Sequence, residues 1–148
     1  MKTRRGFTLI EMMIVISVIA ILIGVLLPTF RGTQDEALTQ RSRSELRTIA
    51  TALESYYIHN SNAYPSALTS LTTATPRIIN RVPDDPFRGA SGTSYSYGRD
   101  SGATPIYYVV WSYGPDRAAG ITGISTVGAL TGTQGDDLCI TNGTATTC

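Results

Sequence analysis

The chain has 148 residues, 42% of them hydrophobic and 16% charged, which fits one small domain with an appendage. Its formal net charge of +1 gives no clustered basic excess, so we expect no nucleic-acid partner. Three of the 12 basic residues, Lys2, Arg4 and Arg5, precede the first long apolar run. Without them, 12 − 3 = 9 basic residues stand against 11 acidic ones, a net charge of −2.

The first thirty residues combine a short basic start with a long apolar run. Residues 1–6 form a short, basic and polar segment. The run from Phe7 to Phe30 is almost wholly apolar, and Glu11 is its one charged residue. A helix over this run is about 36 Å long at 1.5 Å per residue, enough to cross a hydrocarbon core of about 30 Å. The basic flank places its N-terminal end in the cytoplasm, so the remainder of the chain faces outward.

Two ordinary explanations of this run are unsatisfactory. A secretory signal has its cleavage site after the apolar run, at small residues, and here the run leads into Pro28-Thr29-Phe30-Arg31-Gly32 instead. A plain signal anchor explains the hydrophobicity but not Glu11. A carboxylate near the end of a membrane helix costs a few kcal/mol and usually has a function and a partner.

The segment Gly6-Phe7-Thr8-Leu9-Ile10-Glu11 resembles the type III signal of type IV pilins and type II secretion pseudopilins. The resemblance implies cleavage by prepilin peptidase between Gly6 and Phe7, on the cytoplasmic side, and N-methylation of Phe7. Glu11 then becomes the fifth residue of the mature chain, where the family has its glutamate. Pro28 becomes the twenty-second, where many members have a helix-weakening proline.

Cleavage before Phe7 would give Glu11 a partner of opposite charge. Cleavage creates an α-amino group with a reference pKa of roughly 7.7–8, and methylation leaves it cationic. In a bundle of stacked helices, Glu11 of one subunit can reach the Phe7 nitrogen of a neighbour, an arrangement favoured in a low-dielectric core. We therefore expect Glu11, Phe7 and Pro28 to serve assembly.

From Thr33 to His59 the pattern remains helical but becomes amphipathic. Apolar residues recur with a period near 3.6 after a weak turn at Ser42, and charged residues occupy the other face. The expected apolar positions are Leu38, Leu46, Ile49, Leu53 and Tyr56 or Tyr57. We predict one helix from Phe7 to His59, with residues 7–30 as the membrane and assembly segment and residues 31–59 as the amphipathic half.

Residues 60–148 form the predicted globular region. Asn60-Ser61-Asn62 ends the helix, and strands are expected at Ser94–Tyr97 and Ile106–Tyr113. After Asp116 we expect irregular loop and short strands. The resemblance implies an α+β, pilin-like fold in which one long N-terminal helix packs on a small antiparallel β-sheet.

The chain contains, in this order, Asp-Pro-Phe, Tyr-x-Tyr, a predicted strand and Gly-Pro-Asp. This order resembles the major pseudopilin of type II secretion, in which the loop after the last long strand binds calcium. Asp116, Asp136 and Asp137, with Asp100 as a further candidate, offer the hard oxygen ligands that Ca²⁺ prefers. The alternative is that these aspartates cap turns.

Cys139 and Cys148 are the two cysteines of the chain. In the oxidising compartment that a membrane-targeting start implies, a close pair usually forms a disulfide; two free thiols are the alternative. Closing this loop of about ten residues contributes roughly 2.5–3 kcal/mol in the chain-entropy model. Such a terminal disulfide is more typical of type IV pilins. In this chain it is an alternative to calcium as the link that holds a sparsely packed loop.

Catalytic motifs are absent from the sequence, and its one histidine, His59, lies at a predicted helix end. We predict a non-enzymatic filament subunit in the bacterial inner membrane that homopolymerises into a periplasmic pseudopilus and aids protein export. The implied partners are prepilin peptidase, the assembly platform and minor pseudopilins. The alternative is a type IV pilin of a surface pilus for adhesion, twitching motility or DNA uptake.

Overall fold

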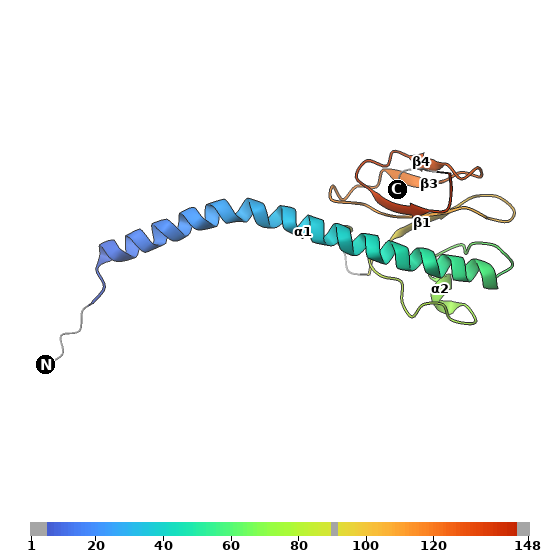
Figure 1. Cartoon of the computed structure of the whole chain (residues 1–148), viewed down its shortest axis with the longest axis horizontal. Coiled ribbons are helices and arrows are strands. Elements are labelled where there is room, and N and C mark those ends of the chain that lie inside the picture. The colour runs from blue at the N-terminus through green and yellow to red at the C-terminus, as the bar shows by residue number, and fades with distance from the viewer. Residues whose placement is uncertain (1–5, 90–91, 145–148) are drawn as a thin grey trace. The chain divides into compact units, whose positions relative to one another are not determined.

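The computed structural model describes residues 6–89 and 92–144, apart from the side chains of residues 27–31 (Figure 1). The chain divides into two compact units, residues 1–37 and residues 38–148. The helix α1 (Leu9–His59) contributes to both units, and the second unit also holds a four-residue helix, α2 (Ser70–Thr73), and five strands within its described part. The predicted α+β class, a long N-terminal helix with a small antiparallel sheet, is confirmed.

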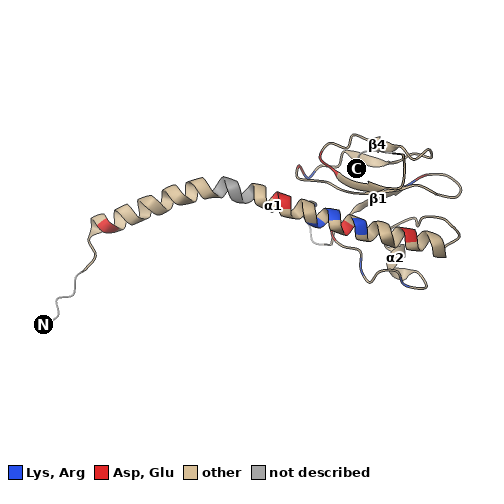
Figure 2. Ribbon diagram, in the orientation of Figure 1, with Lys and Arg blue, Asp and Glu red and all other residues tan. Residues whose placement is uncertain are grey.

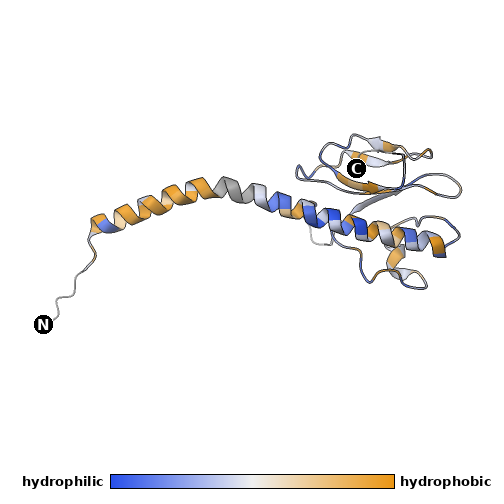
Figure 3. Ribbon diagram, viewed as in Figure 1, coloured by the Kyte–Doolittle hydropathy of each residue, from blue (hydrophilic) through white to orange (hydrophobic). Residues whose placement is uncertain are grey.

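The first unit is dominated by the apolar beginning of α1. Every residue from Leu9 to Leu26 is exposed, and Figure 3 shows the hydrophobic colour running along this part of the helix. These 18 residues form, in the described part of the chain, the one helical segment long and apolar enough to cross a membrane. At 1.5 Å per residue they extend about 27 Å. Pro28 falls among the side chains outside the description, so its role stays a prediction.

In the second unit, α1 supplies one wall of the core. Leu46, Ile49 and Leu53 are buried as predicted, whereas Tyr56 and Tyr57 are half-buried. Charged residues occur repeatedly along this part of α1 (Figure 2). The amphipathic pattern therefore predicted the buried face of the helix.

The helix predicted to run through Ser42, where the apolar pattern is weak, is confirmed. The helix continues through this position, and the Ser42 side chain is fully buried beside Tyr95. A small side chain is what this close approach requires. The predicted end of the helix is confirmed, because α1 stops at His59 and both Ser61 and Asn62 adopt left-handed backbone conformations.

Three strands form the main sheet in the order β1-β2-β5, with both pairs antiparallel. They are β1 (Ser96–Arg99), β2 (Tyr108–Ser112) and β5 (Leu138–Thr141). The predicted first strand began two residues too early, and the predicted second strand extended beyond both ends of β2. A separate hairpin joins β3 (Ile121–Ile124) to β4 (Leu130–Gly132), which agrees with the expected short strands after residue 116.

The two faces of the main sheet pack against different partners. All five residues of β2 are buried, and alternate side chains of a strand point to opposite faces. Tyr108 and Val110 join the cluster of α1, whereas Val109 and Trp111 pack with Ile121 and others of the β3–β4 hairpin. The second unit is thus three layers: the helix, the main sheet and the hairpin (Figure 1).

Candidate functional site

The start of α1 presents the predicted cleavage site in an accessible form. Gly6 and Phe7 precede the helix in irregular backbone and are exposed, with Phe7 82% exposed. A helical peptide bond is engaged in intrahelical hydrogen bonds and resists a protease, whereas this bond lies outside the helix. The structure therefore places the predicted cut where an enzyme can reach it.

Thr8 is a functional residue that the sequence reasoning missed. The Glu11 Oε2 atom accepts hydrogen bonds from the Thr8 N–H and the Thr8 hydroxyl, both at 3.0 Å, and the Glu11 N–H donates to Thr8 Oγ1 at 3.3 Å. This reciprocal arrangement is a capping box, and the spacing Thr-x-x-Glu was the signal for it. It also explains why α1 begins at Leu9 rather than at the predicted Phe7.

The capping box leaves half of the Glu11 carboxylate available. Both bonds from Thr8 end on Oε2, and Oε1 accepts no hydrogen bond from any residue that the structure describes. The carboxylate is held toward the N-terminal end of α1, close to where cleavage would create a new amine. Glu11 thus has a fixed orientation and an oxygen with room for a second partner.

Asp116 and Asp136 come from two different loops and meet at one corner of the second unit. The Asp116 N–H donates to Asp136 Oδ2 at 2.8 Å, and Asp116 Oδ1 accepts from the Ala118 N–H at 2.8 Å. Both aspartates are exposed. With Asp137 they form what we call the acidic corner.

Asp137 is the buried member of the acidic corner and is only 3% exposed. Its Oδ2 atom accepts from the Gly120 N–H at 2.8 Å and the Ile121 N–H at 2.7 Å. Its Oδ1 atom is buried with no hydrogen-bond partner in the described structure. Burial, reinforced by the charges of Asp116 and Asp136, raises the pKa of Asp137 above its ordinary value, against the opposing effect of the two backbone donors.

The acidic corner suits a cation in charge and donor type, but it is not a finished metal site. No group of three histidine, cysteine or carboxylate side chains in the described ranges is arranged to hold a metal ion. The orphaned Asp137 Oδ1 is the observation that favours a missing positive partner, because an unpaired buried carboxylate oxygen is costly. Calcium at Asp116, Asp136 and Asp137 therefore stays a prediction.

Asp100 does not belong to this set. Its Oδ1 accepts from the Gly102 N–H, and its Oδ2 accepts from the Ile106 and Tyr107 N–H groups, at 2.7–2.8 Å. Burial opposes its ionisation, but these three donors outweigh burial and hold the pKa of Asp100 below its usual value. Asp100 caps the turn between β1 and β2, as the alternative interpretation proposed.

Cys139 is buried in β5 on the face that packs against the hairpin. Cys148 lies outside the described residues. The Cys139–Cys148 disulfide therefore remains a prediction.

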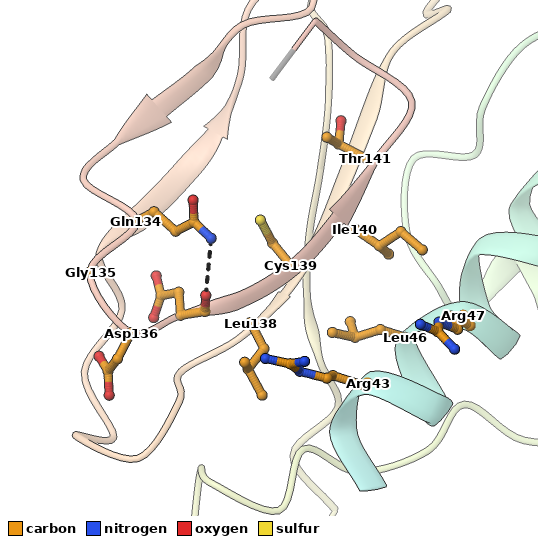
Figure 4. A pocket seen from close by; sticks show the side chains of 11 residues that line it. Arg43, Leu46, Arg47, Gln134, Gly135, Asp136, Leu138, Cys139, Ile140 and Thr141 are labelled. Atoms are coloured by element: carbon orange, nitrogen blue, oxygen red, sulfur yellow. Dashed lines mark hydrogen bonds between the residues drawn. The ribbon is translucent and has the colours of Figure 1, made fainter. Parts of the chain in front are cut away.

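A groove of about 690 Å³ runs between α1 and β5 within the second unit. Arg43, Leu46 and Arg47 line it from α1, and residues 134–141 line it from the β5 side (Figure 4). Arg43 and Arg47 are exposed, and neither makes an ion pair with any residue that the structure describes. Arg41, by contrast, is paired with Glu45 at 2.8 Å.

Two family models account for most of the chain. The prokaryotic N-terminal methylation motif matches residues 1–27, and type II secretion system protein G matches residues 29–128. The chain belongs to the type II secretion system protein G family.

Curated members of the protein G family are clearly similar to this chain. The type II secretion system core protein G of Dickeya chrysanthemi is 32% identical over 129 residues, which are 78% of this chain and 80% of that protein. The same protein of Klebsiella pneumoniae is 34% identical over 101 residues, 59% of this chain and 71% of that protein. No solved structure matches the chain at a significant level.

Membership of the protein G family confirms the resemblance seen in the sequence. It favours the pseudopilin over the type IV pilin, and a structural subunit over an enzyme. The methylation motif covers Gly6, Phe7 and Glu11, the same residues that begin the exposed apolar helix.

Proposed function

We propose that the mature chain begins at Phe7 and is the repeating subunit of a periplasmic type II secretion pseudopilus that aids protein export. Prepilin peptidase cuts between Gly6 and Phe7 on the cytoplasmic side of the inner membrane, and Phe7 is then N-methylated. The observation that carries this proposal is the exposed, non-helical Gly6–Phe7 bond directly before a capped apolar helix. Family membership supports it.

Before assembly, the apolar part of α1 spans the inner membrane once, with its N-terminus in the cytoplasm. The exposed side chains of residues 9–26 suit contact with lipid tails, and they suit contact with copies of the same helix equally well. Transfer from membrane to filament therefore exchanges one apolar environment for another. The assembly platform and minor pseudopilins are the partners of this transfer.

The ion pair between Glu11 and a neighbour's Phe7 amine aligns the copies. Thr8 holds the carboxylate through Oε2, so Oε1 can accept a hydrogen bond from the cationic amine without breaking the cap. In an apolar surrounding, leaving both charges without partners is strongly unfavourable, so only registers that pair them are tolerated. Glu11 thus selects a register rather than simply adding attraction.

Two matched variants of the full chain separate charge from capping. Glu11→Gln keeps the shape and an oxygen acceptor but removes the charge. Thr8→Ala keeps the charge and the backbone bond to Glu11 but removes the two hydrogen bonds of the hydroxyl. Both are expressed with a type II secretion machinery, sheared fibres are quantified, and the mature N-terminus is checked by mass spectrometry. We expect Glu11→Gln to be cleaved but to form almost no fibres, and Thr8→Ala to form reduced amounts. Wild-type amounts of fibre from Glu11→Gln would overturn the ion-pair mechanism.

The pseudopilus assignment has its own test. Deleting the gene is expected to trap exported proteins in the periplasm. Normal export by the deletion strain, with the subunit found in long surface fibres of the wild type, would instead support the type IV pilin alternative.

We further propose that the acidic corner binds one Ca²⁺ ion. Asp137 Oδ1, together with the exposed carboxylates of Asp116 and Asp136, would hold it, and the ion would neutralise their mutual repulsion. Ca²⁺ at 100 times its dissociation constant should add about 2.7 kcal/mol to the free energy of unfolding. The measurement is thermal unfolding of the detergent-solubilised chain with Ca²⁺ or Mg²⁺. Asp137→Asn should abolish the Ca²⁺ response and the control Asp84→Asn should keep it; a response retained by Asp137→Asn would refute this site.

A further inference from the structure

Arg43 and Arg47 stand one helical turn apart on α1, so their side chains project from the same face. Both border the groove beside β5, and Figure 4 shows them on the α1 side of that groove. Asp136 lines the same groove, but its Oδ2 is engaged by the Asp116 N–H and it forms no ion pair with either arginine. Two positive charges thus face the groove with no ion-pair partner in the described residues.

The second unit has more exposed positive charge than its sequence suggests. Residues 38–148 contain eight arginines and eight acidic residues. Three of those acids, Asp85, Asp100 and Asp137, are buried and accept hydrogen bonds from backbone N–H groups. Seven of the eight arginines are exposed, whereas only three of the acids, Glu54, Asp116 and Asp136, are exposed.

The complementary charge lies on the other unit of the chain. Residues 7–37 contain the acids Glu11, Asp35 and Glu36 and one base, Arg31. Glu11 is assigned to the Phe7 amine in the proposed function, and Asp35 and Glu36 are adjacent acids that form an acidic segment of α1. A second copy of this chain therefore carries a ligand of the right charge for Arg43 and Arg47.

The proposed register brings these groups to similar levels. Glu11 and Phe7 are four residues apart, so pairing them between copies offsets parallel helices by at most about one turn, roughly 6 Å. Identical subunits in a helical filament are offset by the same axial distance at every residue. Asp35–Glu36 precedes Arg43 by only seven or eight residues of α1, so the neighbour's acidic pair comes within about two turns of Arg43. Helical side chains tilt toward the N-terminus, which directs Arg43 back toward that acidic pair.

From these observations we propose that Arg43 and Arg47 bind the Asp35–Glu36 pair of a neighbouring copy in the filament. This inference rests on the proposed function, because the register comes from the Glu11 ion pair. It assigns the groove beside β5 to a second copy of this chain. It also gives the lateral contact a direction, since the arginines of one subunit meet the acids of the next.

Charge reversal in the full chain tests the contact. The variant Arg43→Glu/Arg47→Glu, expressed with the secretion machinery, should lower the yield of sheared fibres several-fold. The matched control Arg77→Glu/Arg117→Glu makes the same change of net charge at two exposed arginines away from the groove. Adding Asp35→Arg/Glu36→Arg to the first variant should restore fibres. Equal yields from the groove variant and the control, or a charge swap that restores nothing, would overturn the inference.

Cysteine crosslinking gives a readout that does not depend on yield. A chain carrying Glu36→Cys is coexpressed with one carrying Arg43→Cys, and a disulfide-linked dimer should form only when both are present. Arg77→Cys replaces Arg43→Cys as the control. Fibres that depend on Glu11 but give no dimer would refute the contact and leave the proposed function intact. Wild-type chains that form no fibres would overturn both.

Discussion

Replacing Asp85 with alanine tests the connection between the loop before β1 and the end of β2. The Asp85 side chain is 3% exposed. Its Oδ1 atom accepts from the Phe87 N–H at 3.0 Å and the Ser112 hydroxyl at 2.6 Å, and its Oδ2 accepts from the Tyr113 N–H at 3.2 Å. Asp85→Ala removes all three acceptor contacts at once and leaves two backbone donors without a partner.

The cost follows from those bonds. A hydrogen bond to a charged group contributes about 1.5–3 kcal/mol, and a buried donor left unsatisfied costs about 1–3 kcal/mol. The serine hydroxyl can rotate to another acceptor, and removing the carboxylate also removes its own desolvation penalty, so the three terms do not add fully. We expect a loss of about 3–5 kcal/mol, equivalent to roughly 10–20 °C in melting temperature for a unit of this size.

The chain provides its own probe for this measurement. Trp111 is the one tryptophan, is buried, and precedes Ser112 in β2, so its fluorescence reports unfolding at the affected place. Thermal unfolding of detergent-solubilised full-length chain is compared with Asp84→Ala, which removes the neighbouring carboxylate and its exposed ion pair with Arg81. The control should change stability by less than about 1 kcal/mol. If Asp85→Ala melts within a few degrees of the control, the reasoning from hydrogen bonds is wrong.

Two predictions concern the acidic corner. Because burial, with Asp116 and Asp136, raises the pKa of Asp137, the folded state binds the proton more tightly than the unfolded state. Without calcium, the free energy of unfolding should therefore fall as pH rises from the ordinary value of 3.8 through the raised pKa, and Asp137→Asn should flatten that fall. A wild-type curve that rises there would contradict the assigned shift. Gly114 has φ +67° and an added Cβ would lie 2.3 Å from the Asp136 carbonyl oxygen, so Gly114→Ala should destabilise the unit by more than about 1 kcal/mol. Gly135→Ala, with φ +56° but open space around the new Cβ, isolates the backbone strain, and equal losses in the two variants would show that the contact with Asp136 does not matter.

The helix and the central strand were predictable because local pattern determines them. Leu46, Ile49 and Leu53 recur at helical spacing, and Tyr108 to Ser112 is a run of aromatic and β-branched residues. The N-terminus of α1 was misplaced because the Thr8–Glu11 pair was not recognised as a cap. Ser42 weakens the apolar pattern because it is a polar residue on the buried face, and its contact with Tyr95 depends on tertiary packing that the local pattern does not reveal.

The remaining strands could not be placed from the sequence. The β3–β4 hairpin is short and rich in glycine and threonine, and β5 is a four-residue strand that pairs with β2, far away in the sequence. Such pairing depends on long-range packing rather than on local propensity. The acidic corner was predicted as a cluster, but the sequence did not indicate that Asp136 is exposed while the adjacent Asp137 is buried.

Salt should separate the two kinds of ion pair on which the filament is proposed to rest. The Glu11–amine pair lies among apolar helices, where mobile ions do not enter, whereas the contact of Arg43 and Arg47 with a neighbour lies at the exposed margin of the second unit. The Debye length falls from about 10 Å at 0.1 M salt to about 3 Å at 1 M, so only the outer contact is screened. For this test, fibres are assembled from Glu36→Cys and Arg43→Cys chains under reducing conditions, moved to about 1 M NaCl and then oxidised. We expect far fewer disulfide-linked dimers than at low salt, whereas the fibres should remain polymeric. Fibres that dissolve in salt would mean that exposed charges, and not Glu11, hold the copies together.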